Sequence, residues 1–239
     1  MKKLKDRIPW QRLFMQGAMI VTSILTAFTV DTWWEGKQNV ITERKHLEAL
    51  ERDFEIAKAR ADSSLQVALS CKEDVFTLFM AIQQGTSDKL GRSAFTMMIK
   101  AIEYEVFSIP TGAYDAMVSA GEVKILRNRA LKQSMADFYG GFEDTRVSEA
   151  QLLKVVFAFQ TSEVFAQKIN WAEIGYSTMF PDEPLGDRLN ALVASWTGDK
   201  AIYNWLCLLM ASQDAVSEDY VFLGERIDQI LINLADELD

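Results

Sequence analysis

The chain has 239 residues, of which 49% are apolar and 25% are charged, and its formal net charge is −9 at pH 7. This acidic balance argues against binding to nucleic acid or to anionic lipid through charge. Because the chain contains one histidine, metal sites that need several histidines are excluded, and any hydrolytic triad would depend on that single histidine, which we expect to be exposed. We therefore expect no enzymatic activity and no cofactor.

The first element in chain order is an uncharged run of eighteen residues, Leu13–Val30, which we call the apolar run. Its length lies at the short end of what spans a bilayer. Trp10 and Trp33 would be roughly 34 Å apart along a helix, which suits the two membrane interfaces. A buried core helix rarely has such charged flanks, and no signal-peptide cleavage site follows the run. We therefore expect an uncleaved transmembrane helix over residues 13–34.

Basic residues set the expected orientation of this helix. The first twelve residues contain five basic residues and one acidic residue, a net charge of +4, which leaves −13 for the rest of the chain. The positive-inside rule places such an end in the cytoplasm. We therefore expect a protein of the bacterial inner membrane, with a cytoplasmic basic tail at residues 1–12 and a periplasmic domain at residues 35–239.

One stripe of the expected span carries small and hydroxyl-bearing residues. Ala18, Thr22 and Thr26 recur every four residues, with Gly17 beside them. Small residues at this spacing let helices approach closely in lipid, so we interpret the stripe as a packing surface. The alternative is that the hydroxyl groups bond back to carbonyls of their own helix.

The residues expected at the membrane interface are tryptophans and acids: Trp10, Asp31, Trp33, Trp34 and Glu35. Among them, Asp31 lies at the hydrocarbon edge, where a carboxylate is costly unless it is solvated or paired. Two interpretations stay open. Either Asp31 contacts a basic group of a partner or a lipid amine, or it reaches into the headgroup region as a boundary acid.

Beyond the span, apolar residues recur with helical spacing and no alternating strand-like run stands out, so we expect an all-α fold. The sequence predicts a long helix over residues 37–84, with apolar residues every seven as in a coiled coil. Gly36 is a candidate joint between the span and this helix, and the alternative is one continuous helix through both. Shorter helices are expected over residues 93–107 and 112–120, the second capped by Thr111 and ended by Gly121.

The second half of the domain is expected to end in another long helix. Asn128 should start a helix that stops at Gly140-Gly141, and a further helix should cover residues 144–169. Residues 170–187 contain two prolines and two glycines and predict a surface loop. The last helix, over residues 199–238, has the strongest seven-residue repeat. We expect the two long helices to lie side by side in an elongated bundle.

Candidate chemical groups are few. Glu43 and His46 have the Glu-x-x-His spacing of diiron bundles, but such a site needs two pairs, so we interpret His46 as part of a solvated helix face and expect no metal. The acids around Glu51–Glu55 and Glu103–Glu105 are interpreted as surface charge. Cys71 and Cys207 lie on the two long helices. In a periplasmic domain they could form a disulfide, and the alternative is two buried thiols.

Two short motifs stand out. The first is VDTWWE at Val30–Glu35, followed by the charged stretch TERKHLEALERDF. The second is YDAMVSAGE at Tyr114–Glu122, which continues through Ile125 and Leu126 to Tyr139. Both resemble an uncharacterised bacterial family of single-pass membrane proteins with a Val-Asp-x-Trp-Trp-Glu juxtamembrane motif. The resemblance covers roughly residues 10–65 and 110–140. It implies one span and a helical domain of unknown function, and it implies no activity.

The sequence therefore predicts a non-enzymatic, membrane-anchored scaffold or accessory subunit of a membrane protein complex or homo-oligomer. Its expected partners are membrane lipid and either other membrane-protein subunits or a second copy of the chain. The alternative function is a periplasmic helical sensor that binds a small ligand and signals through a partner. A partner would be needed because the expected cytoplasmic part has only twelve residues.

Overall fold

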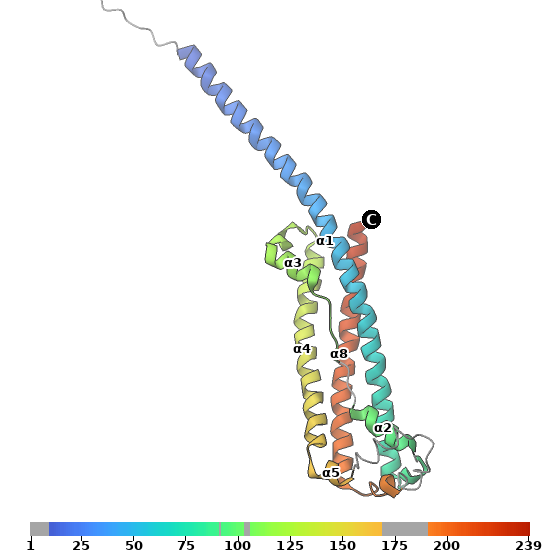
Figure 1. The fold of residues 1–239 in the computed structure, drawn as a ribbon. Helices are drawn as coiled ribbons and strands as arrows, with labels where there is room; N and C mark the ends of the chain where they lie inside the picture. The colour runs from blue at the N-terminus through green and yellow to red at the C-terminus, as the bar shows by residue number, and fades with distance from the viewer. Residues whose placement is uncertain (1–9, 91, 103–105, 169–190) are drawn as a thin grey trace, which may run out of the picture.

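The longest helix, α1 (Trp10–Gln83), runs without a break from the apolar run into the helical domain (Figure 1). The computed structural model describes residues 10–90, 92–102, 106–168 and 191–239, and these residues form helices and no strand. The all-α prediction is therefore confirmed. Gly36 is not a joint, because α1 passes through it as regular helix, with open space where a side chain would stand.

The elements that follow α1 agree with most of the expected boundaries. Gly121 ends its helix in the left-handed conformation, at φ 69°, as the sequence predicts. Asn128 and Asp199 each cap the helix that follows them, since their side chains accept hydrogen bonds from backbone N–H groups of the first turn. The elements in chain order are η1 (Ser87–Leu90), α2 (Arg92–Ile102), α3 (Gly112–Ala120), η2 (Glu122–Ile125), α4 (Arg129–Gln160), α5 (Glu163–Lys168) and α8 (Lys200–Leu238).

The domain is a bundle of three long helices in which α8 packs against both α1 and α4 (Figure 1). The position of a fourth helix is taken by α2, by the extended segment 106–111 and by α3 in turn. Phe107 anchors this segment, because its ring packs against Phe142 on α4 and Tyr220 on α8. On the other side, the Arg60 guanidinium of α1 donates to the backbone oxygen of Ser108. The segment therefore closes the bundle along its length.

The two expected seams form the core. On α1, buried residues recur every three or four positions from Leu47 to Leu78, except that Ala68 is only partly buried, and on α8 they recur in the same way from Ile202 to Leu234. Val40 is half exposed, because the bundle begins after it. The long helices therefore lie side by side as expected, since burying these seams supplies most of the stability of such helices.

Lys58 links α1 to α8 at the surface of the bundle. Its ammonium group lies 3.1 Å from Asp62 on its own helix and 3.0 Å from Asp228 on α8. Burial alone would lower the pKa of Lys58, but hydrogen bonds and attraction to the two carboxylates outweigh it and raise the pKa overall. The two helices are thus joined by a charged pair as well as by their apolar seams.

Three expected features are wrong. The chain does not break at Gly140-Gly141, because α4 continues through both glycines to Gln160. The helix expected over residues 93–107 does not extend to Phe107, which lies in the extended segment. Thr111 makes no side-chain capping hydrogen bond to α3. The expected loop 170–187 and the acids Glu103 and Glu105 lie outside the described residues.

Candidate functional site: the apolar run and the near cap

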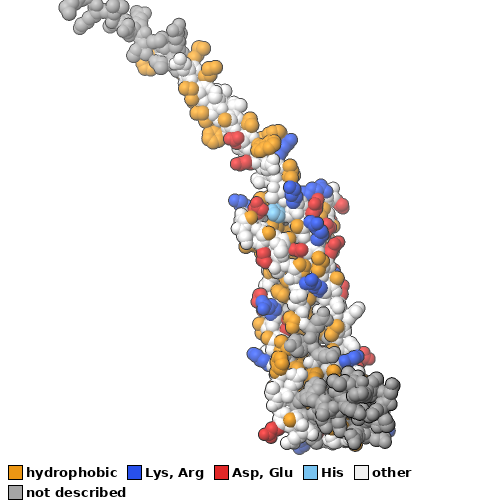
Figure 2. Space-filling model, in the orientation of Figure 1, with side chains coloured by type: hydrophobic (Ala, Val, Ile, Leu, Met, Phe, Trp, Pro, Cys, Tyr) orange, Lys and Arg blue, Asp and Glu red, His pale blue; other side chains and the backbone are white. Residues whose placement is uncertain are grey.

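The apolar half of α1 projects from the bundle and is exposed along its length. None of its most apolar eighteen-residue window is buried, and it is long and apolar enough to cross a membrane. Figure 2 shows apolar side chains along this part of the helix, whereas acidic and basic side chains are spread over the bundle. Trp10, Trp33 and Trp34 are exposed near its two ends. An exposed apolar surface of this size is typical of a site that contacts a membrane or another protein.

The small-residue stripe faces outward, and its hydroxyl groups are already satisfied within α1. Thr22 donates to the carbonyl of Ala18, and Thr26 donates to that of Thr22, each at 2.8 Å. The structure therefore contains the alternative hydrogen bonding that the sequence left open. Close approach of another helix at Gly17, Ala18, Thr22 and Thr26 would rest on shape and not on these hydroxyl groups.

Asp31 lies at the end of a shallow groove along this face of α1. The groove is lined by Met19, Thr22, Ser23, Thr26, Ala27, Val30 and Asp31. One turn further on, the Lys37 ammonium group lies over the Trp33 ring, 4.5 Å from its centroid. Glu35 and Trp34 follow on the same exposed helix. The acid and the small residues thus belong to one continuous surface.

Where α1 enters the bundle, α3 and η2 pack against it and form what we call the near cap: α3, η2 and residues 43–60 of α1. Its most buried polar contact is made by Glu43, which is 3% exposed. One carboxylate oxygen of Glu43 accepts from the backbone N–H of Arg127 at 2.6 Å, and the other accepts from the Arg127 guanidinium at 2.7 Å. This acid therefore fastens the turn before α4 to α1.

Two further side chains of α1 hold the near cap. Asp53 accepts from the backbone N–H of Ala113 at 2.9 Å, so it caps α3 from another helix, in place of Thr111. His46 lies 2.7 Å from Glu122 and is largely buried against it. The solvated-face interpretation of His46 and the surface interpretation of Asp53 are therefore wrong. Both side chains are used to bind α3 and η2.

An aromatic cluster lies beneath these polar contacts. The rings of Tyr114 and Tyr139 stack with centroids 4.1 Å apart, and Phe54 packs edge-on against Phe138. Burial raises the pKa of the Tyr139 phenol well above its ordinary value, and neighbouring Tyr114, together with two carboxylates, raises it further. The near cap thus brings the charged stretch that follows the first motif into contact with α3 and η2, which contain the second motif.

Glu149 makes a second buried polar contact, near the middle of the bundle. One of its carboxylate oxygens accepts from the backbone N–H of Phe107 at 2.8 Å and from the Tyr220 hydroxyl at 2.7 Å. Sequence reasoning missed this residue. The signal was its position, because buried residues of α4 recur every three or four positions from Thr145 to Phe159 and Glu149 falls on that pattern. An acid at a core position requires donors, and the extended segment supplies one.

Cys71 and Cys207 are not joined by a disulfide in this structure. Cys71 is buried, and its thiol donates to the backbone oxygen of Lys100 at 3.5 Å, so it faces α2 and not α8. Cys207 is half exposed on α8. Of the two alternatives, the structure therefore contains separate thiols, one of them buried.

The near cap offers contacts that hold segments together and no evident reaction centre. Within the described ranges, no group of three or more His, Cys, Asp or Glu side chains is placed to hold a metal ion. Comparison with protein-family models, curated proteins and solved structures finds no significant match to this chain. The resemblance to the single-pass family therefore stays a prediction that rests on the two motifs.

Proposed function

We propose that this protein is a non-enzymatic, membrane-anchored scaffold or accessory subunit, acting in a membrane protein complex or as a homo-oligomer. The observation that carries the proposal is the continuity of α1 from the exposed apolar run into the buried core. A domain attached through a continuous helix is held at a set height and direction, whereas a flexible linker would let it wander. Such a continuous connection suits a protein whose role is to hold a partner at a set position relative to the membrane.

In the proposed arrangement the protein lies in the bacterial inner membrane, with its basic tail in the cytoplasm and its bundle in the periplasm. The part of α1 after Trp34 is roughly 70 Å long, at about 1.5 Å per residue, so the far end of the bundle would stand well away from the lipid. A reporter that is active only in the periplasm, fused after Asp239, should be active. Activity of a cytoplasmic reporter alone would contradict this orientation.

The apolar run is proposed to associate through the stripe that includes Thr22. The variant Thr22→Leu adds bulk to that face, and it leaves insertion intact because leucine is favourable in lipid. Ile24→Phe is the matched control, because successive residues turn by about 100° and Ile24 therefore faces away from Thr22. We expect Thr22→Leu to weaken the native assembly at least tenfold, as about 1.4 kcal/mol of lost packing would do, and Ile24→Phe to leave it unchanged.

The measurement is made on the full chain purified from its native membranes in a mild detergent. Light scattering after size-exclusion chromatography gives the mass of the protein in each preparation, and mass spectrometry identifies any chain present at a fixed ratio. Wild type and Ile24→Phe should share one assembled mass, and Thr22→Leu should shift toward the monomer. A wild-type monomer with no partner at a fixed ratio would contradict the scaffold role.

A further inference from the structure

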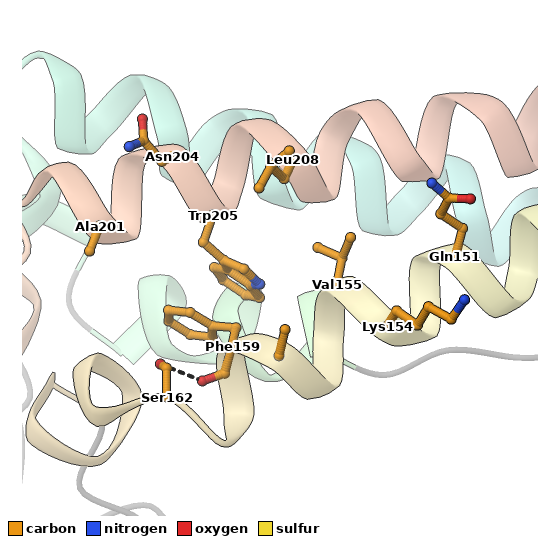
Figure 3. A pocket seen from close by; sticks show the side chains of 10 residues that line it. Gln151, Lys154, Val155, Phe159, Ser162, Ala201, Asn204, Trp205 and Leu208 are labelled. Carbon is orange, nitrogen blue, oxygen red and sulfur yellow. Dashed lines mark hydrogen bonds between the residues drawn. The ribbon is translucent and has the colours of Figure 1, made fainter.

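A cavity lies between α4 and α8 at the end of the bundle far from the apolar run (Figure 3). Its volume is about 520 Å³, which is within the range of small-molecule pockets. The rings of Phe159 and Trp205 stack face to face in its wall, with ring centroids 3.8 Å apart and an angle of 13° between the ring planes. Ala158 and Ala201 leave the neighbouring space open. The cavity is therefore largely apolar, with one rigid aromatic wall.

Trp205 places an unused hydrogen-bond donor at this cavity. Its side chain is only 5% exposed, yet its indole N–H has no acceptor among the described residues. Figure 3 shows the indole nitrogen facing the space between the two helices, on the side of Val155. An indole N–H can only donate, and buried donors nearly always have an acceptor. The cavity thus presents a site for an acceptor atom.

The charge of the lining is opposite to that of the chain. Among the described residues that line the cavity, Lys154 is the only charged one, and none is acidic. No ion pair joins Lys154 to another described residue, although the chain as a whole carries a net charge of −9. A cation and a buried donor beside apolar walls favour an acceptor that carries negative charge.

We propose that this cavity binds an organic acid with an apolar body, namely an aromatic or fatty carboxylate. The carboxylate accepts a hydrogen bond from the Trp205 N–H and pairs with Lys154. The apolar body lies against Phe159, Val155 and Leu208. None of these residues belongs to the near cap or to the apolar run, so the site goes beyond the proposed scaffold role and can fail or stand without it.

The test measures binding of a fluoronaphthoate to the full chain in lipid nanodiscs by fluorine NMR. Empty nanodiscs give the share of the probe that enters lipid. Saturable binding to the wild-type chain is expected, weakened about tenfold in Trp205→Phe and in Lys154→Gln, because each loses one contact to a charged group. Methylnaphthalene, which has the same body and no acceptor, should compete at least about tenfold less well.

Three further variants separate loss of the site from loss of the fold. Trp196→Phe changes a buried tryptophan outside the cavity, Lys132→Gln removes a lysine elsewhere on α4, and both should keep wild-type affinity. Ala158→Trp fills the cavity from an exposed position and should abolish binding. Circular dichroism checks that each variant keeps its helix content. The proposal is overturned by wild-type binding no greater than that of empty nanodiscs, by unchanged affinity in Trp205→Phe, or by equal competition from methylnaphthalene.

Discussion

The two ends of the helical domain differ in the side chains that make their buried contacts. In the near cap, buried or half-buried acids of α1 accept hydrogen bonds from backbone groups far away in the sequence, as Glu43 does from Arg127 and Asp53 from Ala113. At the far end, buried Ser87 donates to the backbone oxygen of Val193, and Phe159 and Trp205 stack beside a cavity. Directional contacts to backbone groups define one geometry, whereas apolar packing tolerates a change of neighbour. The end that faces the anchor is therefore the one at which acids of α1 fix the positions of distant backbone N–H groups.

The largest expected effect tests the near cap through Glu43→Ala. This change leaves the backbone N–H of Arg127 without its acceptor and also removes the charged contact to the guanidinium, so it should cost about 3 kcal/mol of unfolding free energy. Denaturant unfolding of the full chain, followed by circular dichroism in one detergent, measures the loss. Glu48→Ala is the control, because Glu48 pairs with Arg44 at the surface.

For Glu48→Ala we expect a change within about 0.5 kcal/mol, as for exposed ion pairs generally. Glu43→Gln keeps one acceptor oxygen for the backbone N–H and should lose about half as much as Glu43→Ala. Equal stabilities of Glu43→Ala and Glu48→Ala would show that directional contacts do not distinguish the near cap from the rest of the surface.

A smaller effect is expected for Asp53→Ala. Because Asp53 caps α3 from α1, its loss should cost about 1 kcal/mol, the usual value of an N-terminal cap. Hydrogen exchange of the α3 backbone should speed up more than that of α8, since only α3 loses its cap. Asp144→Ala, an exposed acid on α4, serves as the control. Uniform exchange rates in both variants would argue against capping by Asp53.

The third effect appears only at high pH and concerns Tyr139. Its pKa is raised in the folded protein, so its contribution to stability is complete below its ordinary pKa near 10 and is lost as pH rises above that value. Wild type should therefore lose about 0.5 kcal/mol more per pH unit than Tyr139→Phe above pH 10, a figure discounted for partial exposure. Paired unfolding curves at neutral and alkaline pH check this, and parallel losses in the two proteins would contradict it.

The smallest effect on stability is expected at the far end, for Trp205→Phe. The change removes a buried donor that has no described acceptor, so the loss of ring area is offset by relief of its desolvation. We expect a net change within about 1 kcal/mol, although burying a smaller ring in place of a tryptophan usually costs more. The same unfolding assay applies. A loss as large as that of Glu43→Ala would remove the contrast between the two ends.

The helices and the core could be predicted because they depend on patterns along the chain. The repeats on α1 and α8 alone identify the buried seams. Gly121 marks the end of α3 and Asn128 marks the start of α4 through local backbone chemistry. Gly140-Gly141 misled the prediction because packing overrides propensity there. A side chain at Gly141 would come within 3.3 Å of the Phe222 ring, so the small residue lets α8 pack against an unbroken α4.

The polar contacts could not be predicted in the same way. Glu43, Asp53 and Glu149 bind backbone N–H groups that are 42 to 84 residues away, and only the folded chain places those groups. Nothing in the local sequence separates Asp53 from the surface acids beside it. The cavity could not be predicted from the sequence either, because its walls come from two helices whose mutual position depends on the whole bundle.

The continuity of α1 also fixes the rotation of the bundle about the axis of α1. Because a helix turns by about 100° per residue, the stripe at Thr22 has one fixed angular position around that axis relative to α4 and α8. Two copies joined through that stripe would hold their bundles at one fixed angle to each other. A single residue inserted after Gly36 would swing the bundle by about 100° and lift it by about 1.5 Å, with every contact of the near cap kept. Angular placement is thus encoded in the number of residues between the apolar run and Glu43.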